Sequence, residues 1–308
     1  MFVFFLTRLL RAAVTILAVV TFAFVVLRMS GDPAQVLLGP DVPQEAVDAF
    51  RKRWGLDQPL WIQYFAYIQS MLSGDFGVSM RDRSPAIELV MQRVPATLQL
   101  TIPALILKLV IGIPAGVYAA LHRHSFADRG VILLAILGFT IPSFVMGLLL
   151  VLIFSVTLGL LPSGGQDTWM HGILPTIMMS IGGIGILARF SRSAMIEVLG
   201  QPYVRTASAK GVTWPDVVWR HALPNASVPI VTIVGFMVGS LIAGAVVVES
   251  IFSWPGIGRL LVVSVGNRDL AVVQCILLVI AVTMVVSNLI VDLLYGWLDP
   301  RLRAQTAH

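Results

Sequence analysis

Six runs of predominantly apolar residues, each long enough to cross a lipid bilayer, constrain this chain more than any other feature of its sequence. They extend over residues 9–27, 96–121, 131–160, 173–190, 228–248 and 271–295, and Pro142 interrupts the third. A membrane-spanning helix needs roughly 17 to 25 such residues, because hydrocarbon offers no partner to an unpaired backbone N–H or C=O group. With 57% hydrophobic and 12% charged residues, the chain is expected to be an all-α, polytopic membrane protein with six transmembrane helices.

The distribution of Lys and Arg gives the six spans an orientation. The side that holds both termini carries eleven basic residues against four acidic ones, and such an excess marks the cytoplasmic side of a membrane protein. Because basic residues dispersed over short loops are explained by topology, we do not expect nucleic acid as a partner. We divide the chain into residues 1–28 (N-terminal tail and first span), 29–93 (a polar, helical, extracytoplasmic segment, here called the cap), 94–296 (membrane core) and 297–308 (cytoplasmic C-terminal tail).

No pattern in the sequence points to catalysis. None of the three lysines follows a glycine, so the Gly-Lys of a phosphate-binding loop is missing, and neither a His-Glu-x-x-His pair nor a Gly-x-Ser-x-Gly turn occurs. The five histidines do not have the spacing of metal ligands. We therefore expect no enzymatic activity, metal site or cofactor in this chain.

Two charged residues, Lys108 and Glu249, are candidates for a translocation path. Lys108 falls in the middle of the second apolar run, and Glu249 lies near the outer end of the fifth. A charge at the centre of a bilayer costs at least about 2.5 kcal/mol, so it usually faces a polar path or an ion-pair partner. Both alternatives stay open for Lys108. For Glu249, solvation or helix capping near the membrane surface is the simpler explanation.

A polar, basic segment over residues 203–224 separates the fourth and fifth apolar runs. Its pattern predicts a short helix, a turn at Gly211 and a second short helix that begins at Thr213 and is ended by Leu223 and Pro224. A membrane protein with an ordered loop of this size on its basic side is expected to bind a partner there.

This segment resembles the EAA loop of ABC importer permeases, with a Gly four residues after an Ala and Leu-Pro twelve residues further on. Ala207, Gly211, Leu223 and Pro224 match at the correct spacing. The chain departs from the general pattern at three positions, where Arg205, Thr206 and His221 replace the usual Glu, Ala and Ile.

The motif Tyr-Val-Arg-Thr-Ala-x-Ala-Lys-Gly at residues 203–211 resembles the corresponding motif of the dipeptide/oligopeptide/nickel branch of this family. Within that branch it is similar to the first of the two permease subunits. Shorter motifs of the same branch follow in order along nearly the whole chain. They lie at residues 31–33, 55–60, 74–77, 95–98, 141–144, 249–256 and 292–301.

The resemblance implies a type I ABC importer transmembrane domain in the bacterial inner membrane, with both termini cytoplasmic. It implies as partners a second homologous permease subunit, two cytoplasmic ATP-binding subunits, an extracytoplasmic substrate-binding protein and membrane lipid. ATP and Mg²⁺ would be bound by the ATP-binding subunits. The loop at about residues 196–226, here called the coupling loop, would contact those subunits through Arg205, Thr206, Ala207, Lys210, Gly211, His221, Leu223 and Pro224.

The cargo is less constrained than the class of protein. The resemblance makes peptides the first choice, with glutathione or nickel chelates as alternatives. An ion-coupled secondary transporter is the alternative from another class. That alternative predicts inverted repeats and coupling-ion ligands in mid-membrane, and no such repeat is visible in the sequence.

Overall fold

The computed structural model describes residues 2–29, 31–39 and 42–298, and these ranges are built from helices without a β-strand. Five helical segments are long and apolar enough to cross a membrane, and a bent pair of helices supplies a sixth span. The five are Leu6–Met29, Ala86–Leu121, Trp169–Leu199, Trp214–Gly239 and Leu270–Ile290. The predicted all-α architecture with six spans is confirmed.

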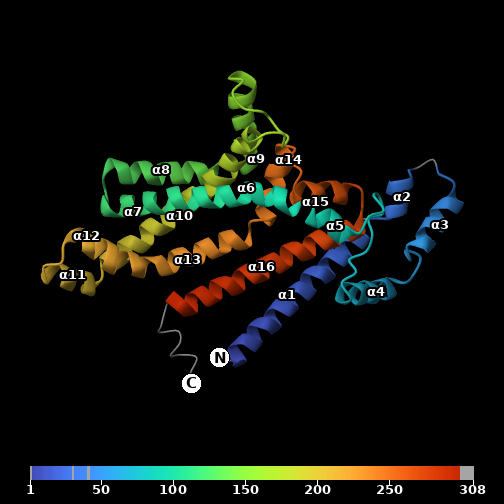
Figure 1. Cartoon of the computed structure of the whole chain (residues 1–308), viewed down its shortest axis with the longest axis horizontal. Coiled ribbons are helices and arrows are strands. Elements are labelled where there is room, and N and C mark those ends of the chain that lie inside the picture. Colours follow the sequence, from blue (N-terminus) through green and yellow to red (C-terminus); the bar gives the residue numbers. More distant parts are fainter. Residues whose placement is uncertain (1, 30, 40–41, 299–308) are drawn as a thin grey trace.

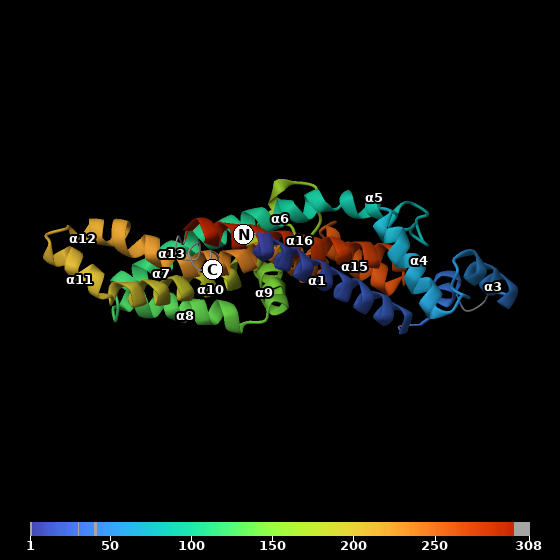
Figure 2. The same cartoon turned by 90° about the horizontal axis from the view of Figure 1, so that it is seen from below.

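The molecule is elongated, and the two views show different elements at its two ends (Figures 1 and 2). One end, which we call the loop end, carries α11 (Pro202–Ala209) and α12 (Trp214–Asp216). The opposite end, which we call the cap end, carries the short helices of residues 29–93. These are α2 (Pro33–Leu38), α3 (Gln44–Arg53), α4 (Leu60–Leu72) and α5 (Ala86–Met91).

The spans lie between these two ends, and several of them consist of more than one helix. The first and last are α1 (Phe2–Met29) and α16 (Leu270–Leu298), which pack against each other. The others are formed by α6 (Val94–Leu107), η1 (Lys108–Gly112), α7 (Ile113–Leu121), α8 (Phe126–Thr140), α9 (Ser143–Leu150), η2 (Val151–Thr157), α10 (Ile173–Leu199), η4 (Val217–Ala222) and α13 (Leu223–Gly239). A 3-10 turn, η3 (Trp169–Gly172), precedes α10, and η5 (Ala243–Ala245), α14 (Val246–Ile251) and α15 (Ile257–Gly266) connect α13 to α16.

Two of the spans contain a wide π-helical turn directly before a proline. In the second span, η1 precedes Pro114, and in the fifth, η4 precedes Pro224. A proline has no N–H and its ring collides with the carbonyl four residues earlier, so a regular helix cannot pass through it unchanged. A turn widened by one residue accommodates the ring and lets the helix continue.

The limits predicted for the fifth span are wrong, and so is the expectation that Leu223 and Pro224 end the preceding helix. The helix continues from Trp214 through the wide turn to Gly239. Hydropathy fails here because the first turns of this helix are polar and therefore fall outside the apolar run. At its other end the run up to residue 248 is divided by the turn at residues 240–245.

The third span is broken at Pro142. Helices α8 and α9 meet at 98°, whereas the sequence indicated one interrupted span over residues 131–160. Pro142 disfavours helical geometry at the residue before it, and Ile141 is accordingly extended with φ −72° and ψ 122°. We call residues 141–143 the elbow.

Helix α10 is the centre of the bundle and packs against α6, α7, α8 and α13. Small residues allow this close approach. A Cβ atom at Gly116 of α7 would lie 2.3 Å from the carbonyl oxygen of Ala188, and one at Gly185 would lie 2.6 Å from that of Ala135. At these two glycines the second and third spans therefore pack directly against the backbone of their neighbours.

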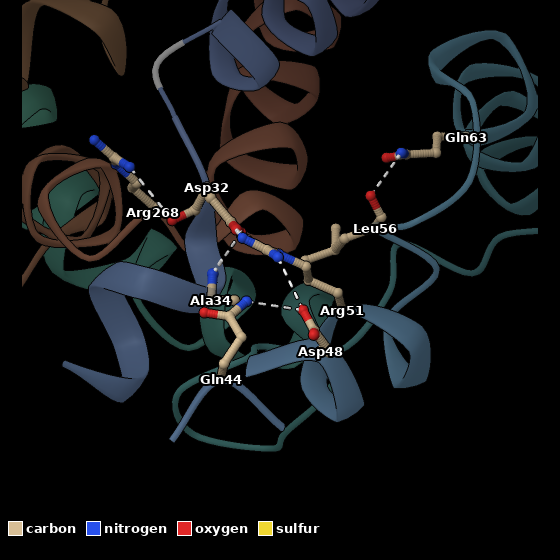
Figure 3. A network of polar contacts seen from close by, with 8 residues as sticks. All are labelled: Asp32, Ala34, Gln44, Asp48, Arg51, Leu56, Gln63 and Arg268. Atoms are coloured by element: carbon tan, nitrogen blue, oxygen red, sulfur yellow. Dashed lines mark hydrogen bonds and ion pairs between the residues drawn. The ribbon is translucent and has the colours of Figure 1, made fainter. Parts of the chain in front are cut away.

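A network of polar contacts centred on Asp32 holds the cap together (Figure 3). The Asp32 carboxylate accepts hydrogen bonds from the backbone N–H of Ala34 at 2.9 Å and from Nε of Arg51 at 2.7 Å. Its backbone carbonyl accepts one from the guanidinium of Arg268 at 3.3 Å, next to the start of α16. The hydrogen bond to Asp32 also raises the pKa of Arg51 above its ordinary value. The Gly-Asp-Pro motif therefore caps α2 and joins the cap to the last span.

Candidate functional site

The coupling loop forms a helix–turn–helix at the loop end, with the turn at Gly211 as predicted. Helix α11 ends at Ala209, and Gly211 then adopts a φ of +83°, a left-handed conformation that costs other L-residues energy. The N–H of Val212 closes the turn by donating to the carbonyl of Ala207 at 3.3 Å. Thr213 occupies the N-cap position, but its hydroxyl makes no capping hydrogen bond with a backbone N–H. The hydroxyl donates instead to the Asp216 carboxylate at 2.8 Å.

One face of the coupling loop is buried against the bundle. Val204, Val217, Val218 and Ala222 are buried, the last two in a cluster that includes Met195 of α10. This packing fixes the loop relative to the fourth span, because both its helices have apolar side chains on the inner face.

The opposite face of the coupling loop contains most of the residues predicted to contact a partner. Arg205, Thr206, Lys210, Gly211 and Pro224 are exposed, whereas Ala207, His221 and Leu223 are half-buried. Arg220 pairs with Asp216 at 3.1 Å, but this pair is largely exposed and contributes little stability.

Sequence reasoning missed two tryptophans on the coupling loop. Trp214 is 54% exposed and Trp219 is 68% exposed. Helical periodicity indicates only one of them: Trp219 lies off the buried stripe formed by Val217, Val218 and Ala222. Trp214 precedes Val217 and Val218 by three and four residues, so the same periodicity would assign it to the buried stripe. Large aromatic side chains that are exposed beside exposed cations are typical of protein interfaces.

A second missed feature is an ion pair between the ends of the third and fourth spans. Arg192 of α10 donates to both carboxylate oxygens of Asp128 on α8, through Nη2 at 2.8 Å and through Nε. The carboxylate also accepts from the backbone N–H of His124 at 2.9 Å, and its side chain is only 4% exposed. The two residues are 64 positions apart in the chain, so no local pattern could indicate the contact.

A cavity of about 360 Å³ lies where the broken spans meet. Its walls include the elbow, α10, the end of α13 and the turn that follows it. Four methionines contribute to the lining, namely Met146, Met178, Met179 and Met237. Several lining residues are exposed, among them Phe139, Ser143 and Ser240, so the cavity opens to the surface of the chain.

Lys108 also lines this cavity. Its aliphatic stem crosses α10 at Gly183, where a Cβ atom would lie 2.6 Å from both Cδ and Cε of the lysine. Within the described part of the chain, the ammonium group has no carboxylate within ion-pair distance and no hydrogen bond. Lys108 is thus placed at the cavity wall without an acidic partner among these residues.

Glu249, the second candidate for the path, is fully buried and does not belong to the cavity lining. Its carboxylate accepts hydrogen bonds from Thr97 Oγ1 at 2.6 Å and from the backbone N–H of Arg259 at 3.0 Å. Of the two roles expected for Glu249, solvation does not apply because the side chain is buried, and helix capping is the role that its contacts support. Glu249 binds the first turn of α15, where free N–H groups and the helix dipole favour a negative charge.

A multi-span helical protein with a packed helix–turn–helix at one end and a cavity at its broken spans belongs to the class of membrane transport subunits. Two family models match the sequence. The model described as "Binding-protein-dependent transport system inner membrane component" matches residues 112–304, and the corresponding N-terminal model matches residues 1–101. The chain belongs to this family, and it is a permease of a type I ABC importer.

Curated relatives match over almost the full chain. The glutathione transport system permease protein GsiC of Salmonella choleraesuis (strain SC-B67) is 43% identical over 300 residues, which cover 97% of this chain and 98% of the relative. The protein of the same name from Escherichia coli (strain K12) is 41% identical over 288 residues, 94% of each chain.

A solved structure shares the fold. The inward-facing MetNI methionine ABC transporter superposes with a TM-score of 0.58 at 19% identity, covering 69% of this chain and 97% of that chain. As a member of this family the protein is a multi-pass component of the bacterial inner membrane and acts with ATPase and substrate-binding partners. It is a transport permease and not an enzyme.

Proposed function

We propose that this permease forms the translocation path of an importer for short peptides of the glutathione type. The observation that carries the proposal is the identity of 43% and 41%, over nearly the whole chain, with permeases named for glutathione transport. The cavity supports it, because about 360 Å³ is within the size range of small-molecule sites. Its methionines support it too, since flexible thioether side chains adapt to cargo of varying shape.

We further propose that both termini and the coupling loop are cytoplasmic, and that the cap faces the substrate-binding protein. A second homologous permease and two ATP-binding subunits would complete the complex, and those subunits would hold ATP and Mg²⁺. The eleven basic residues on the side of the termini support this orientation. The exposed Arg205, Lys210, Trp214 and Trp219 on the coupling loop are suited to an interface with the ATP-binding subunits.

The fifth span provides the mechanical link from the coupling loop to the cavity. The helix from Trp214 to Gly239 is continuous through its wide turn, and its 26 residues extend for about 39 Å at 1.5 Å per residue. Its first turns belong to the coupling loop, and Met237 near its other end lines the cavity. Closure of the ATP-binding subunits would move this helix as a unit and favour one arrangement of the cavity over another.

The test is import by the complete transporter in proteoliposomes, with its binding protein outside and ATP inside. We expect ATP-dependent uptake of radiolabelled glutathione, and competition by unlabelled short peptides. Nickel uptake in the same vesicles measures the alternative cargo. Absence of glutathione uptake, with an active ATPase and a binding protein loaded with glutathione, would contradict the proposal.

A further inference from the structure

We infer that Lys108 is a specificity-determining residue of the translocation path, and that its ammonium group binds a carboxylate of the cargo in the methionine-lined cavity. This inference rests on the proposed function, because it assigns the part of the path that recognises peptide-like cargo. It adds a chemical criterion: the cargo must present a carboxylate at this depth.

The backbone around the cavity indicates a polar path at this point. Two helix breaks border the cavity, one at the elbow and one in the turn at residues 240–245. Backbone groups that leave helical geometry inside a membrane need water, ligand or protein as partners, so such breaks occur where they are buried or border a cavity. Residues of both breaks line the cavity, so the irregular backbone borders a space that water or cargo can occupy.

The charge of Lys108 is available to a ligand. The described part of the chain offers this ammonium group neither an ion pair nor a hydrogen bond. The cost of placing a charge at this depth is therefore not offset by any described residue. A carboxylate on the cargo would offset it in each transport cycle and would bind through a charge-assisted hydrogen bond.

The surroundings of Lys108 hold it in place while leaving its head free. The absence of a side chain at Gly183 lets the lysine stem lie directly on α10, since any Cβ there would collide with it. The rest of the lining is mainly apolar, with Met178 and Met179 on the same helix as Gly183. A single cation in an adaptable apolar wall selects for charge without selecting for one side-chain shape, which suits peptides of varied sequence.

The experiment compares the wild type with Lys108→Met, a neutral variant of similar length, in the complete transporter. Two cargoes are used, glutathione and the same tripeptide with both of its carboxylates converted to carboxamides, each saturating the binding protein. The readout is the number of cargo molecules imported per ATP hydrolysed. We expect Lys108→Met to lower this ratio for glutathione about tenfold or more, the effect of losing one charge-assisted hydrogen bond. For the carboxamide cargo, Lys108→Met should lower this ratio much less. The variant Lys108→Arg, which keeps the positive charge, should retain most of the wild-type ratio for glutathione.

A chemical rescue covers the case in which the binding protein rejects the carboxamide. Lys108→Cys, in a background with Cys275→Ala, is expected to regain glutathione import when a thiol reagent attaches an aminoethyl group, but not when it attaches a neutral methyl group. Bound cargo should slow this labelling. Lys52→Met, which removes an exposed cap lysine, controls for a general loss of positive charge.

The outcomes separate this inference from the proposed function. If the wild type imports glutathione but Lys108→Met lowers import and ATP hydrolysis in parallel, or lowers import of both cargoes equally, the lysine is structural and the inference is wrong. A carboxylate of the second permease would give that result. If the wild type imports no peptide cargo at all, the proposed function fails and this inference fails with it.

Discussion

At the scale of single residues, the coupling loop depends on the backbone conformation of Gly211. Apart from Gly211 and its two chain neighbours, no described residue has a heavy atom within 4 Å of the position that a Cβ would occupy there, so a side chain would meet no steric obstacle outside the local backbone. Its effect would come from the positive φ alone. This makes Gly211 a direct probe of the turn, because loss of packing cannot explain the result of a substitution.

We expect Gly211→Val to strain the turn by roughly 1 to 2 kcal/mol and to misplace α11 relative to the second helix of the loop. Membrane insertion should be normal, while recovery of the ATP-binding subunits on copurification and cargo uptake should both fall. The matched control is Gly130→Val, since Gly130 also has open space around its Cβ position and has no positive φ. Equal uptake by the two variants would mean that the turn at Gly211 is not required for coupling.

The ion pair between Asp128 and Arg192 is the other residue-level feature with a large predicted effect. Replacing Arg192 by Met leaves a nearly buried carboxylate without its partner. Breaking a fully buried pair costs about 3 to 5 kcal/mol, and because Arg192 is about one-fifth exposed we expect roughly 2 to 3 kcal/mol here. A lower thermal midpoint of the purified protein in detergent would report this loss.

The double variant Asp128→Leu with Arg192→Met serves as the control for that experiment. Because it removes both charges, it should recover most of the lost thermal stability. A double variant as unstable as Arg192→Met alone would show that packing of the arginine stem, and not the unpaired charge, causes the loss.

At the scale of elements, the wide turn before Pro224 determines how the coupling loop is oriented on the fifth span. A turn widened by one residue rotates everything before it by a large angle around the helix axis, since each residue of a regular helix turns by about 100°. Which face of the coupling loop is buried and which is exposed therefore depends on the wide turn that forms before Pro224.

We expect Pro224→Ala to remove the need for the wide turn, to make the helix locally more stable and to reduce ATPase stimulation by the loaded binding protein. The variant should therefore be more stable than the wild type and yet show weaker ATPase stimulation. Pro229→Ala is the matched control, because Pro229 lies inside the same helix without a wide turn directly before it. If both variants couple equally well, the orientation of the loop does not depend on Pro224.

The elements also show what hydropathy can and cannot predict. One end of the second span was predicted well, because its apolar run and its helical segment both end at Leu121, whereas the helical segment begins ten residues before the run, at Ala86. The fifth was predicted poorly because a helix continues wherever its backbone hydrogen bonds do, and the polar turns from Trp214 lie outside the apolar run. Pro142 indicated an interruption of the third span, but the 98° angle depends on packing between α9 and elements distant in sequence.

The candidate site likewise contains features that the sequence predicts and contacts that it does not predict. Gly211 and the loop around it were predictable, since a turn between two short helices has a local signature. The contacts of Glu249 with Thr97 and the pair of Asp128 with Arg192 join positions 152 and 64 residues apart. Such contacts arise only when the helices pack, so sequence reasoning could identify Lys108 and Glu249 as unusual without separating a cavity residue from a buried cap.

At the scale of the whole molecule, the proposed orientation predicts opposite accessibility of the two ends. Single cysteines at Ser73 and Ser208, in a background with Cys275→Ala, test it directly. Ser73 follows α4 at the cap end and Ser208 lies in α11 at the loop end (Figure 1), and both are exposed. Cys275 is a buried free cysteine, and its replacement by Ala, which removes a single sulfur atom, excludes background labelling at this position.

A membrane-impermeant thiol reagent should label Ser73→Cys in intact spheroplasts and Ser208→Cys only in inverted vesicles, because the basic excess lies on the side of the coupling loop. Ser208→Cys is subject to a second expectation. If the coupling loop binds the ATP-binding subunits, their addition to stripped inverted vesicles should slow its labelling, since a residue within an interface is shielded from reagent. Labelling of Ser208→Cys from outside would reverse the orientation and exclude the proposed docking role. Labelling from inside without any protection would leave the orientation intact but would place the contact with the ATP-binding subunits elsewhere on the chain.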